Sequence, residues 1–128
     1  MAIRVVRLGS PRVVGEGLRL GTVRRPPRGV PKAEFASRDF YDVWMPELAP
    51  SEALVKEAQA AETEAQWRRF LGKYRAEMAQ PERARLLDFL AALSKRTAFA
   101  VGCYCADEAR CHRSVLKALL AERGADFA

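Results

Sequence analysis

The sequence predicts an α/β fold: a small, mostly parallel sheet with helices packed on it, in a single compact domain. Residues 97–105 form a continuous apolar run, as expected of a strand that is buried on both faces of a parallel sheet. A short polar loop leads from this run directly into a helical pattern, which indicates a strand–helix unit. The 128 residues suit one domain, 1–128, which can bury roughly two thirds of the surface that its unfolded chain exposes.

The first part of the chain predicts short strands that are separated by irregular loops. Residues 3–8 and 18–23 mix apolar and charged side chains as strands do, and residues 41–45 predict a short strand or an irregular stretch. The segments 9–17 and 24–31 are rich in glycine and proline, which interrupt regular structure.

The second part predicts three helical regions. The first begins after Ser51, a good N-cap, and runs to about Met78 with a possible break near residues 62–63. The second begins at Pro81, and the last follows the buried strand and ends before Gly124. Apolar side chains at helical spacing indicate core packing in all three regions: Trp67, Phe70, Leu71 and Tyr74; Leu86, Leu87, Leu90 and Leu93; Val115, Leu116, Leu119 and Leu120.

Hydropathy and cysteine usage exclude several classes of protein. No apolar run approaches the ~20 residues that span a bilayer, and Arg4 and Arg7 interrupt the stretch that a signal peptide would need. We therefore expect a cytoplasmic protein with no membrane partner. The three cysteines, Cys103, Cys105 and Cys111, are too close together to form a disulfide framework.

Positive charge is concentrated at the N-terminus. Residues 1–32 hold eight basic residues and one acidic residue, whereas the remainder holds fourteen and fifteen, so the first quarter carries all of the net +6. Such a segment favours phosphate-bearing partners. One alternative function is therefore a nucleic-acid-binding module that uses this segment, although a set of solvated surface arginines would give the same pattern.

Residues 103–114 hold all three cysteines and the single histidine, His112, between the predicted buried strand and the last helix. Ligands bind at this end of strands in open α/β sheets, and a helix N-terminus favours anions. Our leading hypothesis is a phosphate- or nucleotide-binding site for a small molecule. The loop of residues 24–32, called the basic loop below, contributes to this site, and the helix after Ser51 covers it. Its candidate ligand-binding residues are Arg24, Arg28, Arg110, His112, Arg113 and Ser114.

A second interpretation is a reactive thiol. Cys111 precedes a helix and adjoins His112 and Arg113, which can lower the pKa of a thiol and make it a nucleophile or redox sensor. These three residues are the candidate catalytic residues, and the sequence leaves open whether the protein is an enzyme. The C-x7-R spacing from Cys105 to Arg113 differs from the C-x5-R of phosphatase loops.

A third interpretation is a metal site formed by Cys103, Cys105, Cys111 and His112. These residue types suit zinc, but their spacing does not match the common zinc-finger patterns. Cys111 and His112 would diverge by about 100° around a helix unless the helix starts after them. The sequence requires no cofactor, and in a purely structural alternative the cysteines fill core space while His112 and Arg113 hydrogen-bond a neighbouring loop.

The same segments carry a family resemblance. Cys103, a polar loop, and then Cys111-His112-Arg113 opening a helix are similar to the domain-of-unknown-function 488 (DUF488) family. Many members have an acidic residue where this chain has Cys105, so a carboxylate role there is weakened and a metal becomes more plausible.

The remainder of the chain resembles the YeaO-like branch of that family. The matching features are Arg19, four residues of the next segment, Leu48-Ala49-Pro50-Ser51 after Trp44, and the helix with Trp67, Phe70, Tyr74 and Arg75. The four residues are Arg24, Pro27, Arg28 and Gly29, whereas Val23 and Pro26 stand where the branch has an acidic residue and a tryptophan. The resemblance covers nearly the whole chain. It implies a compact α/β fold and no particular activity.

Overall fold

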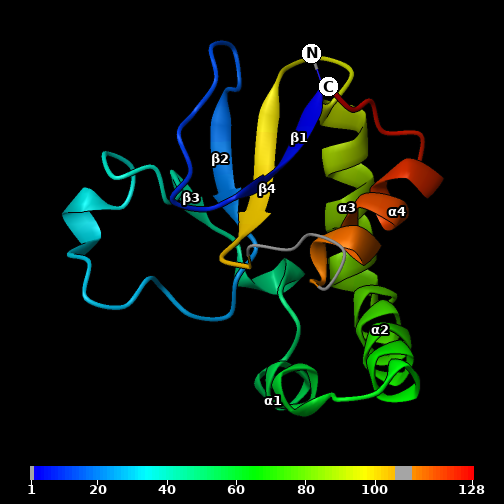
Figure 1. Cartoon of the computed structure of the whole chain (residues 1–128). Helices are drawn as coiled ribbons and strands as arrows, with labels where there is room; N and C mark the ends of the chain where they lie inside the picture. The colour runs from blue at the N-terminus through cyan, green and yellow to red at the C-terminus, as the bar shows by residue number, and fades with distance from the viewer. Residues whose placement is uncertain (1, 106–110) are drawn as a thin grey trace.

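Four parallel strands form the centre of the molecule. The computed structural model describes residues 2–105 and 111–128. Its strands are β1 (Ile3–Arg7), β2 (Leu18–Gly21), β3 (Val43–Trp44) and β4 (Phe99–Cys103), in the spatial order β1-β4-β2-β3 (Figure 1). All three strand pairings are parallel. The predicted α/β class is therefore confirmed.

Four helices accompany this sheet. They are α1 (Glu52–Ala60), α2 (Glu64–Met78), α3 (Pro81–Leu93) and α4 (Arg113–Glu122), with single 3-10 turns at Lys32–Glu34 and Pro46–Leu48. In Figure 1 the strand arrowheads point toward α1, so the carboxyl ends of the strands face this helix. None of the helices in residues 2–105 and 111–128 has the length and hydropathy to cross a membrane.

Capping groups set the helix boundaries near the predicted positions. Ser51 accepts a hydrogen bond from the Leu54 amide, and Thr63 and Gln66 form a reciprocal capping box at the start of α2. This second cap explains why the helical pattern from residue 51 to residue 78 is divided into two helices.

The two faces of the sheet are covered in different ways. Ile3, Leu20 and Val101 project into a core that also contains apolar side chains of α2, α3 and α4. On the other face, Arg19 hydrogen-bonds to residues of the loops on either side of β2, and Gly21 lies against the Tyr41 ring. Helices therefore cover one face, and two long loops cover the other.

Strand β4 lies between β1 and β2, and all five of its residues are buried. This confirms the expected strand that is buried on both faces. A Cβ atom at Gly102 would approach the Val6 carbonyl oxygen to 2.7 Å, so only glycine fits at this position of β4 beside β1. The next residue, Cys103, ends the strand at the edge that faces α1.

Candidate functional site

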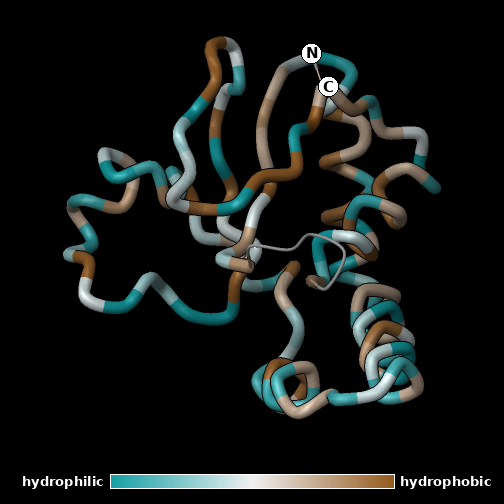
Figure 2. The backbone as a smooth tube through the Cα atoms, in the orientation of Figure 1, coloured by the Kyte–Doolittle hydropathy of each residue, from teal (hydrophilic) through white to brown (hydrophobic). Residues whose placement is uncertain are grey.

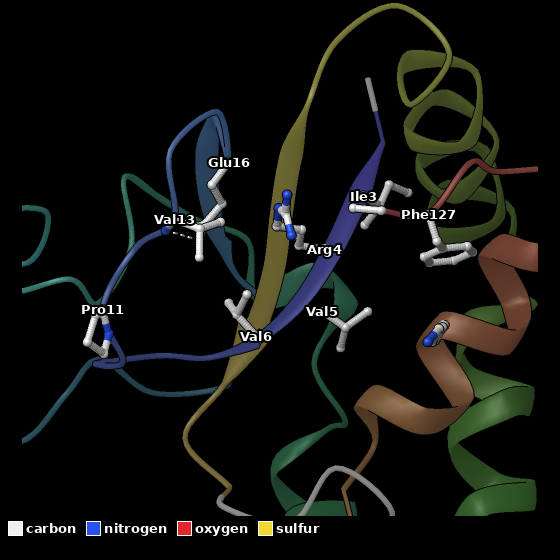
Figure 3. A pocket seen from close by; sticks show the side chains of 10 residues that line it. Ile3, Arg4, Val5, Val6, Pro11, Val13, Glu16 and Phe127 are labelled. Carbon is white, nitrogen blue, oxygen red and sulfur yellow. Dashed lines mark hydrogen bonds between the residues drawn. The ribbon is translucent and has the colours of Figure 1, made fainter.

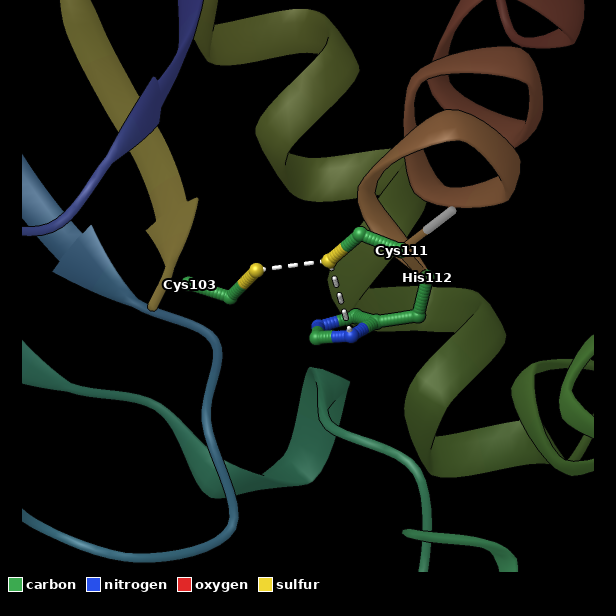
Figure 4. Close-up of side chains that lie close together, drawn as sticks. All are labelled: Cys103, Cys111 and His112. Atoms are coloured by element: carbon green, nitrogen blue, oxygen red, sulfur yellow. Dashed lines mark hydrogen bonds between the residues drawn. The ribbon is translucent and has the colours of Figure 1, made fainter. Parts of the chain in front are cut away.

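The carboxyl ends of β4 and β2 bring distant residues together. Gly21 pairs with Gly102, so the next residues, Thr22 and Cys103, lie at the same edge of the sheet. The residues before α4 approach this edge and supply Cys111 and His112 (Figure 4). This is the edge at which ligands bind in open parallel sheets.

Cys103, Cys111 and His112 form a compact buried cluster. The Cys103 and Cys111 Sγ atoms are 2.6 Å apart, and Cys111 Sγ lies 3.7 Å from His112 Nδ1. One ligand atom from each residue lies within 4.8 Å of the other two (Figure 4). Each of the three residues is at most 9% exposed.

The His112 ring is held in one orientation. Its Nε2 lies 2.8 Å from the Thr22 carbonyl oxygen, to which it donates, so Nδ1 is unprotonated and its lone pair accepts from the Cys111 thiol at 3.7 Å. Burial lowers the pKa of His112 to about 4, which keeps the ring neutral. Tyr74 packs edge-on against this ring with 5.4 Å between centroids, and its hydroxyl donates to the Leu48 carbonyl at 2.7 Å.

The Cys103 and Cys111 thiols each form a hydrogen bond with the backbone. The backbone at Cys105 bonds the Cys103 thiol and the backbone at Arg113 bonds the Cys111 thiol, and each bond favours a thiolate. Hydrogen bonds with Cys105 and Cys111, and then burial, nevertheless raise the pKa of Cys103. The pKa of Cys111 is also raised on balance: the hydrogen bond with Cys103 lowers it, but that with Cys105 and burial outweigh this effect.

Cys105 differs from the other two cysteines, because it is exposed. Hydrogen bonds with Cys103 and Cys111 lower the pKa of its thiol, and the charge of Arg113 acts in the same direction. Strand β4 ends at Cys103, so Cys105 does not share a strand face with it. Cys105 lies beside the three-residue cluster and is not part of it.

The start of α4 removes the geometric objection to a joint role for Cys111 and His112. The helix begins at Arg113, so both residues precede it. Their side chains both point toward Cys103 (Figure 4).

Most of the residues predicted to bind an anion already bond to the protein backbone. Arg24 donates three hydrogen bonds to backbone carbonyls in residues 46–50. Arg113 donates to the Cys105 carbonyl at 2.6 Å, and Ser114 donates to the Cys111 carbonyl. Arg28 is exposed, and Arg110 lies outside the described residues.

A large cavity nevertheless connects the basic loop with the cluster. It has a volume of about 1150 Å³, and its lining includes Arg24, Arg28, Cys103, Cys111 and His112. Four residues of α1, the helix after Ser51, also line it: Val55, Lys56, Ala58 and Gln59. The loop between β2 and β3, which contributes the arginines, is mostly hydrophilic (Figure 2). Loops of this length without regular structure are often functional.

A second, smaller cavity of about 270 Å³ lies along β1 (Figure 3). Its lining mixes apolar side chains such as Val5 and Phe127 with the charged residues Arg4, Glu16 and Lys117. It holds no cysteine or histidine, so it offers no comparable set of reactive groups.

The basic N-terminal segment is not a continuous row of free cations. Arg19 is completely buried and forms an ion pair with Glu16, and Arg12 bonds both Asp39 and Asp42. Within the described ranges, five of the eight basic residues contact protein groups: Arg7, Arg12, Arg19, Arg24 and Arg25. The solvated-arginine interpretation therefore describes only part of this segment.

Two residues that support the site were not predicted to do so. Thr22 acts through its backbone carbonyl, which leaves no signal in the identity of a side chain. Tyr74 was predicted to be a core residue and is one, since it is 0% exposed, but it also positions the His112 ring.

Comparison with known proteins identifies the family. No curated protein and no solved structure gives a significant match. The family model described as the active DUF488-N3 subclade matches residues 3–124, nearly the full length of the chain. The resemblance inferred from the Cys-His-Arg segment is confirmed, and the chain belongs to the DUF488 family.

Proposed function

We propose that this protein is a zinc-dependent enzyme whose metal is held by Cys103, Cys111 and His112. One observation carries the proposal: the two Sγ atoms of Cys103 and Cys111 and one ring nitrogen of His112 lie within 4.8 Å of one another. They come from the end of strand β4 and from the residues just before α4. Thiolate and imidazole ligands together favour zinc over magnesium or calcium.

The surroundings of the ligands support this assignment. The bond from His112 Nε2 to the Thr22 carbonyl fixes the tautomer that leaves Nδ1 available, as is usual for histidines that bind metals. The pKa of Cys103 and Cys111 is raised on balance, although backbone hydrogen bonds favour their thiolates, so a bound zinc ion would have to displace the thiol protons, as metal ions do on binding cysteine.

The distances are close to those of a zinc site. In tetrahedral zinc coordination, sulfur and nitrogen ligands lie about 3.5 to 3.8 Å apart. The Cys111–His112 separation of 3.7 Å already agrees with this range. The two sulfurs, 2.6 Å apart, would separate by about 1 Å on metal binding.

Three ligands and a cavity favour a catalytic site over a structural one. Structural zinc sites are closed by four protein ligands, whereas catalytic sites keep one position open. All three ligands line the large cavity, so a substrate can approach the open position. A metal there would act as a Lewis acid on a bound oxygen or nitrogen atom. The description of the matching subclade as active agrees with catalysis.

Elemental analysis of the purified protein tests the proposal. We expect one zinc per chain in the wild type, and strong loss of zinc in the variants Cys103→Ser, Cys111→Ser and His112→Gln. Cobalt substitution should give the absorption of a tetrahedral thiolate site. Cys105→Ser is the matched control, because it also removes one thiol but lies outside the cluster.

Two results would overturn the proposal. Wild-type protein that binds neither zinc nor cobalt would leave the cluster as a set of thiols without metal. Loss of zinc from Cys105→Ser to the same extent as from Cys111→Ser would indicate four protein ligands, and hence a closed structural site.

A further inference from the structure

The large cavity has three chemically distinct parts. The proposed zinc ligands lie on one side of it. Apolar and aromatic side chains, including Phe40, Val55 and Tyr104, form part of its wall. Basic side chains come from the loop after β2 and from α1. A ligand that fills this space therefore meets a metal site, an apolar wall and positive charge.

The charge that lines the cavity is strongly unbalanced. Four cationic side chains contribute to the lining, namely Arg24, Arg25, Arg28 and Lys56, whereas Glu52 is the acidic residue among the described lining residues. Glu52 is already engaged in an ion pair with Arg25.

Two of the cations are available to a ligand. Arg28 and Lys56 are exposed, and within the described part of the chain no hydrogen bond or ion pair involves either of them. Arg24 keeps its positive charge, because its partners are neutral carbonyl groups. Positive charge of this kind concentrates anions in a cleft.

The apolar wall adds a second requirement. The rings of Phe40 and Tyr104 pack edge-to-face with 6.3 Å between centroids, and the Tyr104 hydroxyl donates to the Arg25 carbonyl at 2.8 Å. This hydrogen bond fixes one aromatic wall to the loop that carries the cations. Ring faces of this type accept planar groups of ligands.

We propose that the cavity binds a nucleotide, with its planar base against Phe40 and Tyr104 and its phosphate at Arg28 and Lys56. The volume of about 1150 Å³ accommodates such a molecule. This inference deepens the proposed function, because the same ligand would lie against Cys103, Cys111 and His112. The phosphate can come from a free mononucleotide or from the end of a nucleic-acid strand.

Isothermal titration calorimetry tests this inference with nucleoside 5′-monophosphates, the matching nucleosides and inorganic phosphate. We expect the monophosphates to bind more tightly than either fragment. Arg28→Ala should weaken monophosphate binding by about tenfold or more, because a charge-assisted bond is lost. Arg4→Ala is the matched control, since Arg4 is also exposed but lines the other cavity.

The outcomes separate this inference from the zinc proposal. Titrations are performed on zinc-loaded and on chelator-treated protein, and circular dichroism verifies that every variant is folded. Monophosphate binding by both forms, weakened in Arg28→Ala alone, supports the nucleotide site whether or not zinc is found. A zinc protein that binds no monophosphate overturns the nucleotide site and leaves the zinc proposal intact.

Two further results are decisive. Equal weakening in Arg28→Ala and Arg4→Ala would show that only the net charge attracts the ligand, and would overturn the site. A 5′-phosphorylated single strand that competes with the monophosphate at equal or higher affinity supports the site and identifies a strand end as the source of the phosphate.

Discussion

Two buried polar clusters differ in how their hydrogen-bonding capacity is used. On the loop-covered face, the Arg19 guanidinium makes five hydrogen bonds, two of them to Glu16, and both residues are almost completely buried. Five is the number of N–H donors that an arginine has. At the carboxyl edge of the sheet, by contrast, the Cys111 sulfur at 3.7 Å is the one hydrogen-bond partner of His112 Nδ1 among residues 2–105 and 111–128, and both residues line a cavity.

This difference separates structure from function. A buried polar group whose every donor is paired stabilises the arrangement around it and has nothing left for a ligand. A buried cluster whose sulfur and nitrogen atoms bond mainly to one another beside a cavity can instead direct these atoms toward a bound ligand. Arg19 and Glu16 therefore fit a structural role, whereas the arrangement of Cys103, Cys111 and His112 fits the metal-binding role proposed above.

The largest expected effect tests the structural half of this comparison. Arg19→Met leaves the Glu16 carboxylate buried without its counter-charge, which should cost about 3 to 5 kcal/mol of unfolding free energy. Chemical denaturation measures the change. Arg75→Met removes a similar but exposed pair with Glu122, which solvent screens, so its loss of stability should be far smaller. Equal, small losses in the two variants would contradict the comparison.

The pH dependence of the stability of the metal-free protein tests the second part of the comparison, the buried cluster that contains His112. Burial lowers the pKa of His112 to about 4, below the value of about 6.5 in the unfolded chain. Between these values the unfolded state binds a proton that the folded state does not, so stability falls as the pH falls, by about 3 kcal/mol in total. Denaturation midpoints from pH 7 to 4 measure this loss.

His112→Gln is the control for this titration. It should flatten the dependence above pH 4 and leave the loss at lower pH, to which Glu16 contributes. Burial would raise the pKa of Glu16, but its bonds with Arg19 lower it on balance, so its contribution disappears only as the pH falls through that lowered value. An unchanged profile in His112→Gln would show that His112 is not buried in the neutral form.

Added zinc should raise the unfolding free energy of the wild type by an amount similar to the pH-dependent loss. At free zinc 100-fold above the dissociation constant, the wild type should gain about 2.7 kcal/mol of stability. Cys111→Ser should gain almost nothing, while Arg12→Ala, altered on the loop-covered face, should respond like the wild type. Thermal unfolding at several zinc concentrations measures the gain, and the same response in all three proteins would refute a specific site.

The smallest effect concerns a bond at the boundary of the site. Tyr74→Phe removes the hydroxyl that donates to the Leu48 carbonyl but keeps the ring against His112. We expect a loss of about 1 kcal/mol in unfolding free energy and unchanged zinc content. Lost zinc with little change in stability would show instead that the hydroxyl takes part in the site.

The sequence was informative where periodicity and burial act locally. The apolar run of residues 97–105, the cap at Ser51 and the break before α2 all leave local patterns, and each was found close to its predicted place. The burial of Arg19 leaves no such pattern. It depends on carbonyl groups of loops that fold over β2 from both sides, and only the tertiary structure brings them there.

The candidate site was predictable in its residue types and not in its geometry. The set of cysteines and His112 was identified, but the position at which α4 begins decides whether Cys111 and His112 can point together. The carbonyl of Thr22, which holds the ring, is ninety residues away along the chain. The meeting of the basic loop with the cluster likewise depends on strand order, which the sequence does not encode locally.

The strand order has a consequence for synthesis on the ribosome. Strands β1 and β2 each hydrogen-bond to β4, which is translated only after α1, α2 and α3. Until then both strands expose unpaired edges, which are prone to aggregate. Pairing across such sequence distances also slows folding. The nascent chain therefore completes its sheet only after the segment that contains β4 has been made.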